Sequence, residues 1–163
     1  MRKFSKIESE LLLKEELTVG IDEVGRGSLI GPVVACAFQL DSIIKKNRSI
    51  DKKRIYIMGL SMGGWGTWDA IQRRPNFFAA AVPICGGGDI SYVKDIAFMP
   101  IWAWHGKDDS VINIERSREM VTALNEMSNQ TKFTEVEYRG HDSWIDVWNN
   151  KEVWKWLYDQ KRN

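Results

Sequence analysis

The chain has 163 residues, of which 44% are hydrophobic and 28% are charged, and its formal net charge is +1. Such a length and composition fit one globular domain, and the near-neutral charge gives no electrostatic basis for binding nucleic acid or an anionic membrane. Cys36 and Cys85 lie too far apart for a metal-binding motif, so we expect two free thiols in a reducing, cytoplasmic environment.

The start of the chain shows no targeting pattern. Residues 1–17 carry charge throughout and contain no apolar core of the kind found in signal peptides, so we expect none. No apolar run approaches the roughly 20 residues that span a bilayer.

The first quarter of the chain predicts a helix and a hairpin. Residues 5–16 have the spacing of a short amphipathic helix. Residues 17–24 and 32–40 are two β-rich runs on either side of the glycine-containing stretch 25–31, which is typical of a hairpin. Residues 41–47 predict a short helix that begins with an aspartate.

From there the pattern alternates between apolar runs and amphipathic helices. The predicted strands cover residues 54–61, 77–85, 99–106 and 132–139. The predicted helices cover residues 61–74, 116–128 and 143–160, the last with a break near Asn149. Alternation of this kind indicates a three-layer α/β/α fold with a mostly parallel sheet. We expect about six strands, with the N-terminal hairpin antiparallel in part.

A sequence motif for nucleophilic catalysis stands between the first strand and helix of this region. Residues 59–63, GLSMG, match G-x-S-x-G directly after a strand and before a helix. The tight turn exposes the hydroxyl of Ser61 at the carboxyl end of the strand. The backbone N–H of Met62 is then one natural oxyanion donor.

The serine needs a base and an acid, and the sequence holds two histidines. His141 follows the last predicted strand, where a loop can reach the serine, whereas His105 ends a strand and is interpreted as structural. The acid is expected between serine and histidine in the chain. Asp108 and Asp109 both occupy that place.

Residues 41–163 resemble the C-terminal part of an α/β-hydrolase, close to carboxylesterases and predicted peptidases related to polyhydroxybutyrate depolymerase and dienelactone hydrolase. The matching stretches include DKKRIYIMGLSMGGWGTWDAI, PIWAWHGKDDSVINIERSREMVTAL and GHDSWIDVWNN. The resemblance implies Ser61 as nucleophile, His141 as general base and Asp109 as the orienting acid, because the family's H-G-x-x-D pattern aligns on Asp109. The upstream His-Gly loop that gives this family a second oxyanion donor has no counterpart here. We therefore expect weak activity, since one lost donor costs about 10²–10³ in rate.

Residues 10–38 resemble instead the N-terminus of ribonuclease HII, on the run GIDEVGRGSLIGPVV. The resemblance implies that Asp22 and Glu23 derive from two of four metal-binding carboxylates, and that Gly25, Arg26 and Gly27 derive from a loop that contacts nucleic acid. Two acids alone make a poor magnesium site, so we expect vestigial residues in a hairpin, no metal and no cofactor. The predicted strand directions set Asp22 and Glu23 on the order of 20 Å from Ser61.

Together these patterns predict a single composite domain over residues 1–163. Residues 1–40 form its ribonuclease HII-like helix and hairpin, and residues 41–163 its truncated α/β-hydrolase-like portion. The main hypothesis is an artificial chimera with no natural function and at most weak carboxylesterase activity. The alternatives are a functional serine esterase and, last, a residual metal-dependent ribonuclease. The expected partners are a small ester substrate and a second copy of the chain, but neither nucleic acid nor a membrane.

Overall fold

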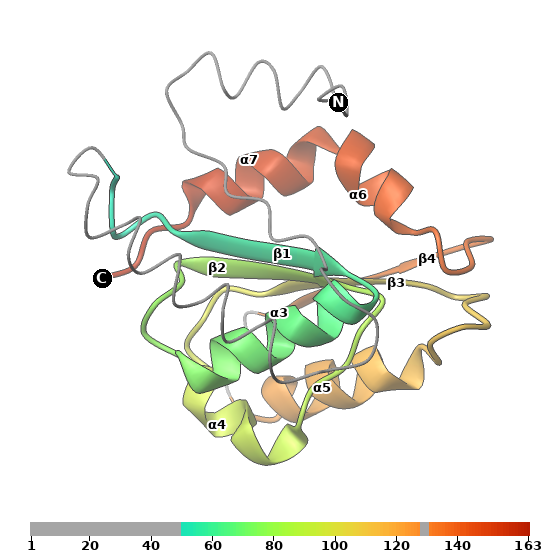
Figure 1. The fold of residues 1–163 in the computed structure, drawn as a ribbon, viewed down its shortest axis with the longest axis horizontal. Helices are drawn as coiled ribbons and strands as arrows, with labels where there is room; N and C mark the ends of the chain where they lie inside the picture. The colour runs from blue at the N-terminus through green and yellow to red at the C-terminus, as the bar shows by residue number, and fades with distance from the viewer. Residues whose placement is uncertain (1–49, 128–130) are drawn as a thin grey trace.

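A four-stranded parallel sheet forms the centre of the computed structural model, which describes residues 50–127 and 131–163 (Figure 1). The strands lie in the order β1-β2-β3-β4, the order in which they occur in the chain. Their bounds are Tyr56–Leu60 for β1, Ala80–Ile84 for β2, Trp102–Gly106 for β3 and Lys132–Val136 for β4. All three pairings are parallel, so the carboxyl ends of the four strands meet at one edge.

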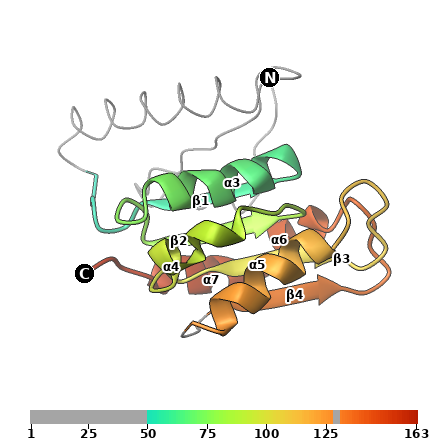
Figure 2. The ribbon, with the colours of Figure 1, turned by 90° about the horizontal axis from the view of Figure 1, so that it is seen from below.

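Helices cover both faces of this sheet, as the apolar character of its strands requires. The helices α3 (Met62–Arg73), α4 (Val93–Ile96) and α5 (Glu115–Asn125) lie on one face, seen in Figure 2, and α6 (Trp144–Asn149) and α7 (Lys151–Asp159) lie on the other. Two consecutive residues of β1 show this division. Ile57 belongs to the core under α3, α4 and α5, and Met58 packs into the core under α6 and α7.

The second core is rich in aromatic side chains. The ring of Trp102 lies 5.4 Å from that of Trp104 and 5.4 Å from that of Trp156, the latter edge-on. The rings of Trp154 and Tyr158 are stacked 6.3 Å apart. Such pairs add to the burial of apolar area, so α7 is held against the sheet by rings from both elements.

The predicted α/β class is confirmed, and four of the expected strands appear with parallel pairing. The break in the last helical region falls at Asn150, whose side chain accepts a hydrogen bond from the backbone N–H of Glu152 and so caps α7. A short 3-10 helix (Ile90–Tyr92) and α4 were not predicted, because three- and four-residue elements show no periodicity.

The predicted N-terminal helix and hairpin lie outside the described residues. So do the candidate nuclease residues Asp22, Glu23, Gly25, Arg26 and Gly27. Within residues 50–127 and 131–163, no helix has the length and apolar character needed to cross a membrane.

Candidate active site

The sharp turn between β1 and α3 presents Ser61 at the carboxyl edge of the sheet. Ser61 has φ 56° and ψ −118°, a backbone conformation that is costly for a residue other than glycine. Its N–H donates to the carbonyl of Ile84 on β2 at 2.9 Å, and its own carbonyl accepts from Gly64 at 2.9 Å. These bonds hold the strained residue in place. The helix begins at Met62, so the Met62 amide belongs to the group of N-terminal donors that a helix leaves without intrahelical partners.

The close approach of β1 to α3 requires the first glycine of the motif but not the second. A Cβ added to Gly59 would collide with the carbonyl oxygen of Gly63 and lie 2.9 Å from Oγ1 of Thr67. A Cβ added to Gly63 would meet nothing within 4 Å. The tight packing at Gly59 therefore sets the angle at which the chain enters the turn at Ser61.

A continuous chain of hydrogen bonds links three side chains from loops at this edge. Oγ of Ser61 lies 2.8 Å from Nε2 of His141, and Nδ1 of His141 lies 2.8 Å from Oδ2 of Asp109. The His141 side chain is 21% exposed, whereas that of Asp109 is fully buried. The ring of Trp144 stands edge-on to the imidazole at 5.9 Å. The structure thus brings together the three residues that the sequence singled out as nucleophile, base and acid.

Asp109 is held as a carboxylate by the turn that follows it. Its Oδ1 accepts hydrogen bonds from the backbone N–H groups of Val111 and Ile112, both at 2.9 Å. Burial alone would raise the pKa of Asp109, but the Ile112 amide, the His141 contact and the Val111 amide together lower that pKa below its ordinary value. Asp108 is exposed, and its backbone N–H bonds to the carbonyl of Arg139. Of the two candidate acids, only Asp109 contacts His141 among the described contacts.

The loops that carry Asp109 and His141 are packed directly on each other. A Cβ added to Gly106 would collide with the carbonyl oxygen of Gly140, the residue before His141. The loop is also fastened by Arg139, which lies 2.7 Å from Asp146 and 3.2 Å from Asp142. The pKa of the Arg139 guanidinium is raised by its hydrogen bond to Asp146, so the cation persists at any ordinary pH. The backbone packing of these two loops therefore places His141 next to Asp109.

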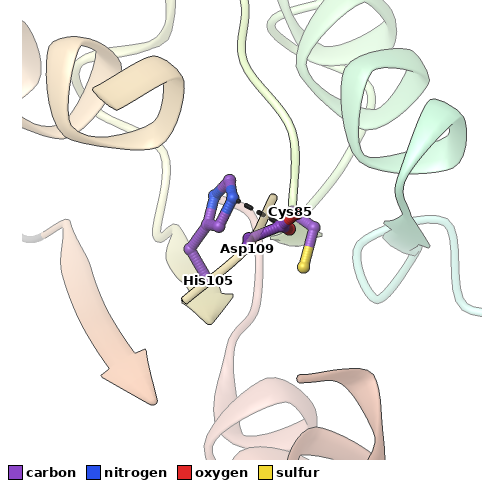
Figure 3. Close-up of side chains that lie close together, drawn as sticks. All are labelled: Cys85, His105 and Asp109. Carbon is purple, nitrogen blue, oxygen red and sulfur yellow. Dashed lines mark ion pairs between the residues drawn. The ribbon is translucent and has the colours of Figure 1, made fainter. Parts of the chain in front are cut away.

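A second, fully buried histidine lies behind the acid. His105 places Nδ1 2.8 Å from Oγ of Ser117 and Nε2 2.9 Å from the carbonyl oxygen of Ile112. The same Nε2 lies 3.3 Å from Oδ2 of Asp109 (Figure 3). Burial lowers the pKa of His105, against the opposing effects of the Ile112 carbonyl and the Asp109 carboxylate. The sequence pattern indicated a structural role for His105 but did not predict its contact with Asp109.

Cys85 completes the buried group. It directly follows β2, with φ 49°, and its sulfur lies 3.0 Å from Oγ of Ser143. Burial raises the pKa of the Cys85 thiol. Cys85, His105 and Asp109 each offer one potential metal-ligating atom within 4.8 Å of the others. In Figure 3, however, the sulfur points away from the His105 ring, and all three residues have protein partners. We assign no metal to this group.

Comparison with known proteins finds similarity to hydrolases over the same part of the chain. Residues 36–103 match the sequence profile of the prolyl oligopeptidase family. A bifunctional acetylxylan esterase/xylanase of Neocallimastix patriciarum is 36% identical over 78 residues, 48% of this chain and 12% of that protein. Poly(3-hydroxyalkanoate) depolymerase C of Paucimonas lemoignei is 43% identical over 49 residues, 30% of this chain and 12% of that protein.

Solved structures show the same likeness. The crystal structure of a thermostable esterase aligns with 43% identity and a TM-score of 0.78 over 80% of this chain and 37% of the esterase. Acylaminoacyl peptidase of Pyrococcus horikoshii aligns with a TM-score of 0.71 and 14% identity over 81% of this chain and 28% of that one. The latter likeness concerns the fold alone.

The fold and these similarities are of the α/β-hydrolase type. This chain spans only 37% of the thermostable esterase and 12% of each of the two curated relatives. The ribonuclease HII resemblance of residues 10–38 finds no counterpart in these matches and stays a prediction.

Proposed function

We propose that this chain is a serine-dependent ester hydrolase. The observation that carries the proposal is the unbroken hydrogen-bond chain from Ser61 through His141 to Asp109, with both links at 2.8 Å. Such an arrangement lets the imidazole remove the hydroxyl proton while the carboxylate keeps Nδ1 protonated and oriented.

In the proposed reaction Ser61 attacks the ester carbonyl as its proton passes to Nε2 of His141. The developing oxyanion accepts a hydrogen bond from the N–H of Met62 at the start of α3. His141 then gives the proton to the leaving alcohol, and an acyl-serine remains. A water molecule, activated by the same imidazole, hydrolyses the acyl-serine and regenerates the enzyme.

An ester is favoured as the substrate over a peptide by the sequence agreement with a thermostable esterase and with an acetylxylan esterase/xylanase. A small acyl group such as acetyl is the first choice to test. Among residues 50–127 and 131–163 we identify one oxyanion donor, the Met62 amide. We therefore expect activated aryl acetates to be hydrolysed much faster than alkyl acetates, because a good leaving group places less demand on oxyanion stabilisation.

The test combines labelling with turnover. A fluorophosphonate probe should label the full chain at Ser61, and hydrolysis of p-nitrophenyl acetate should disappear in Ser61→Ala and in His141→Ala. Labelling that persists in Ser61→Ala would refute the assignment of the nucleophile. A wild-type chain that is folded but neither labelled nor active would refute the proposal as a whole.

We also propose that residues 1–40 have a separate origin from the rest of the chain. The ribonuclease HII-like run GIDEVGRGSLIGPVV supports it, and the hydrolase-type match begins at residue 36, which favours a junction somewhat before Leu40. Asp22 and Glu23 lack the other two acids of a two-metal site. Cleavage of an RNA–DNA hybrid with Mg²⁺ that is lost in Asp22→Asn would show instead that the segment is catalytically competent.

A further inference from the structure

Asp109 has two histidine neighbours, and the proposed mechanism uses only one of them. Oδ2 lies 2.8 Å from Nδ1 of His141 and 3.3 Å from Nε2 of His105. The two rings come from different elements, since His105 lies in β3 and His141 in the loop after β4. The ring of His141 is partly exposed and faces Ser61, whereas the ring of His105 is fully buried.

The chemistry around Nε2 of His105 fixes its role as a donor. Its two neighbours, the Ile112 carbonyl oxygen and the Asp109 carboxylate, can only accept hydrogen bonds. The ring therefore carries a proton on Nε2 and shares it between the backbone of the turn and the carboxylate. On the other side, Nδ1 faces the Ser117 hydroxyl, which also lies 2.7 Å from the carbonyl oxygen of Gly86. His105 is thus clamped between α5 and the turn after Asp109.

His105 influences the Asp109 carboxylate through two sets of contacts. Directly, Nε2 contacts Oδ2. Indirectly, it holds the carbonyl of Ile112, whose own N–H donates to Oδ1 of Asp109. Each oxygen of the carboxylate therefore has one contact that is linked to this ring. Displacing the turn would rotate Oδ2 away from His141.

We propose that His105 is a positioning residue that orients Asp109 toward His141 for the ester hydrolysis proposed above, on which this inference rests. It touches neither Ser61 nor the reacting atoms. His105 acts through the Asp109 carboxylate, so replacing it should disorder the Asp109–His141 hydrogen bond.

Two substitutions separate the donor at Nε2 from the bulk of the ring. The amide nitrogen of glutamine can occupy the place of Nε2, whereas the shorter asparagine can reproduce only Nδ1. In His105→Asn we expect kcat for p-nitrophenyl acetate, normalised to the concentration of titratable Ser61, to fall on the order of 10–100-fold, since small misplacements of catalytic groups cost about that much. KM should change less than about twofold because the ring contacts no substrate. His105→Gln should restore most of kcat.

A readout without substrate keeps this inference separate from the proposed function. The Nδ1 proton of His141, when held by the carboxylate, should give a resolved downfield proton resonance that is present in the wild type and in His105→Gln and absent in His105→Asn. If the wild type shows the resonance but hydrolyses no ester, the proposed function fails while the comparison still tests the positioning role.

An unchanged resonance and an unchanged normalised kcat in folded His105→Asn would overturn the inference and leave a purely structural histidine. If His105→Asn does not fold, Ser117→Ala replaces it, because that change removes the partner of Nδ1 and should broaden the same resonance. A sharp, unshifted resonance in Ser117→Ala would likewise count against the proposal.

Discussion

The contrast between the two glycines of the GLSMG motif gives a sharp test of how the fold builds the serine turn. Gly59→Ala places a methyl group against the main chain of α3, where its Cβ would lie 2.6 Å from the carbonyl carbon of Gly63 and 2.9 Å from Oγ1 of Thr67. Carbon atoms in contact are ordinarily about 3.5–4.0 Å apart. The strand and the helix must therefore separate by roughly 1 Å.

The size of the effect follows from what has to move. Thr67 donates from its hydroxyl to the carbonyl of Gly63 at 2.8 Å, and Gly59 itself sits in a strand paired to β2, so neither side yields as a flexible side chain would. Overpacking of this kind costs about 1–3 kcal/mol, and backbone partners favour the upper end. At about 3 kcal/mol the melting temperature of a chain of this size would fall by roughly 6–12 °C.

The matched control is Gly63→Ala, in the same motif. Its Cβ meets nothing within 4 Å, and alanine favours a helix over glycine by about 1 kcal/mol. We expect a change in the free energy of unfolding between zero and about 1 kcal/mol in the stabilising direction. Urea denaturation followed by tryptophan fluorescence would measure both variants, with equal m-values as the check that the unfolded states are comparable.

The reasoning would be refuted if Gly59→Ala lost less than about 1 kcal/mol, or if the two variants had equal stability. Either result would mean that β1 and α3 lie further apart than the structure has them. Gly59→Ala should also lower labelling of Ser61, because the serine directly precedes the helix that has been displaced.

Three further predictions concern the residues around the acid. Asp109→Asn should lower kcat for an aryl acetate by about 10²–10⁴-fold, while Asp108→Asn, at the exposed neighbouring position, should leave it within about twofold; equal losses would contradict the choice of acid. The pKa of Asp109 is lowered in the fold, so its stabilising effect is present above the pKa of about 4 expected in the unfolded chain and is lost as the pH falls through the folded value. Asp109→Asn should therefore flatten acid unfolding below about pH 4. An unchanged acid transition would argue against a stabilising role of this carboxylate. Since burial raises the pKa of the Cys85 thiol, iodoacetamide at pH 8 should modify Cys85 far more slowly in the native protein than in urea, as read by peptide mapping; equal rates would show that the thiol is accessible.

The longer elements of the fold could be predicted because each has a strong local pattern. The apolar run at β2 is buried at every position, and α3 follows a motif that requires a helix after the turn. The short helices between β2 and β3 could not be predicted in this way. Their only local signal is Asp89, whose side chain accepts from the N–H of Ser91, and such a turn is compatible with many continuations.

The candidate site divides along the same line. Ser61 could be predicted from a contiguous motif, and the order of serine, acid and histidine limited the partners. The choice between Asp108 and Asp109 rested on resemblance, and its physical basis is the turn that buries one side chain and exposes the other. The contact of His105 with the acid depends on how α5 packs against β3 through Ser117, which leaves no periodic signal in the sequence.

The four described strands distribute the site across the whole width of the sheet. Ser61 follows β1, Cys85 follows β2, Asp109 follows β3, and His141 follows β4. The hydrogen bonds that link Ser61, His141 and Asp109 lie within residues 50–127 and 131–163, so this part of the chain holds the proton path. Within those ranges we identify one oxyanion donor, the Met62 amide. The triad and the oxyanion site can therefore be tested separately. Labelling of Ser61 by a fluorophosphonate reports the first, and the ratio of aryl acetate to alkyl acetate turnover reports the second. A small ratio would show that a second donor acts beside Met62, and a very large one that Met62 acts alone.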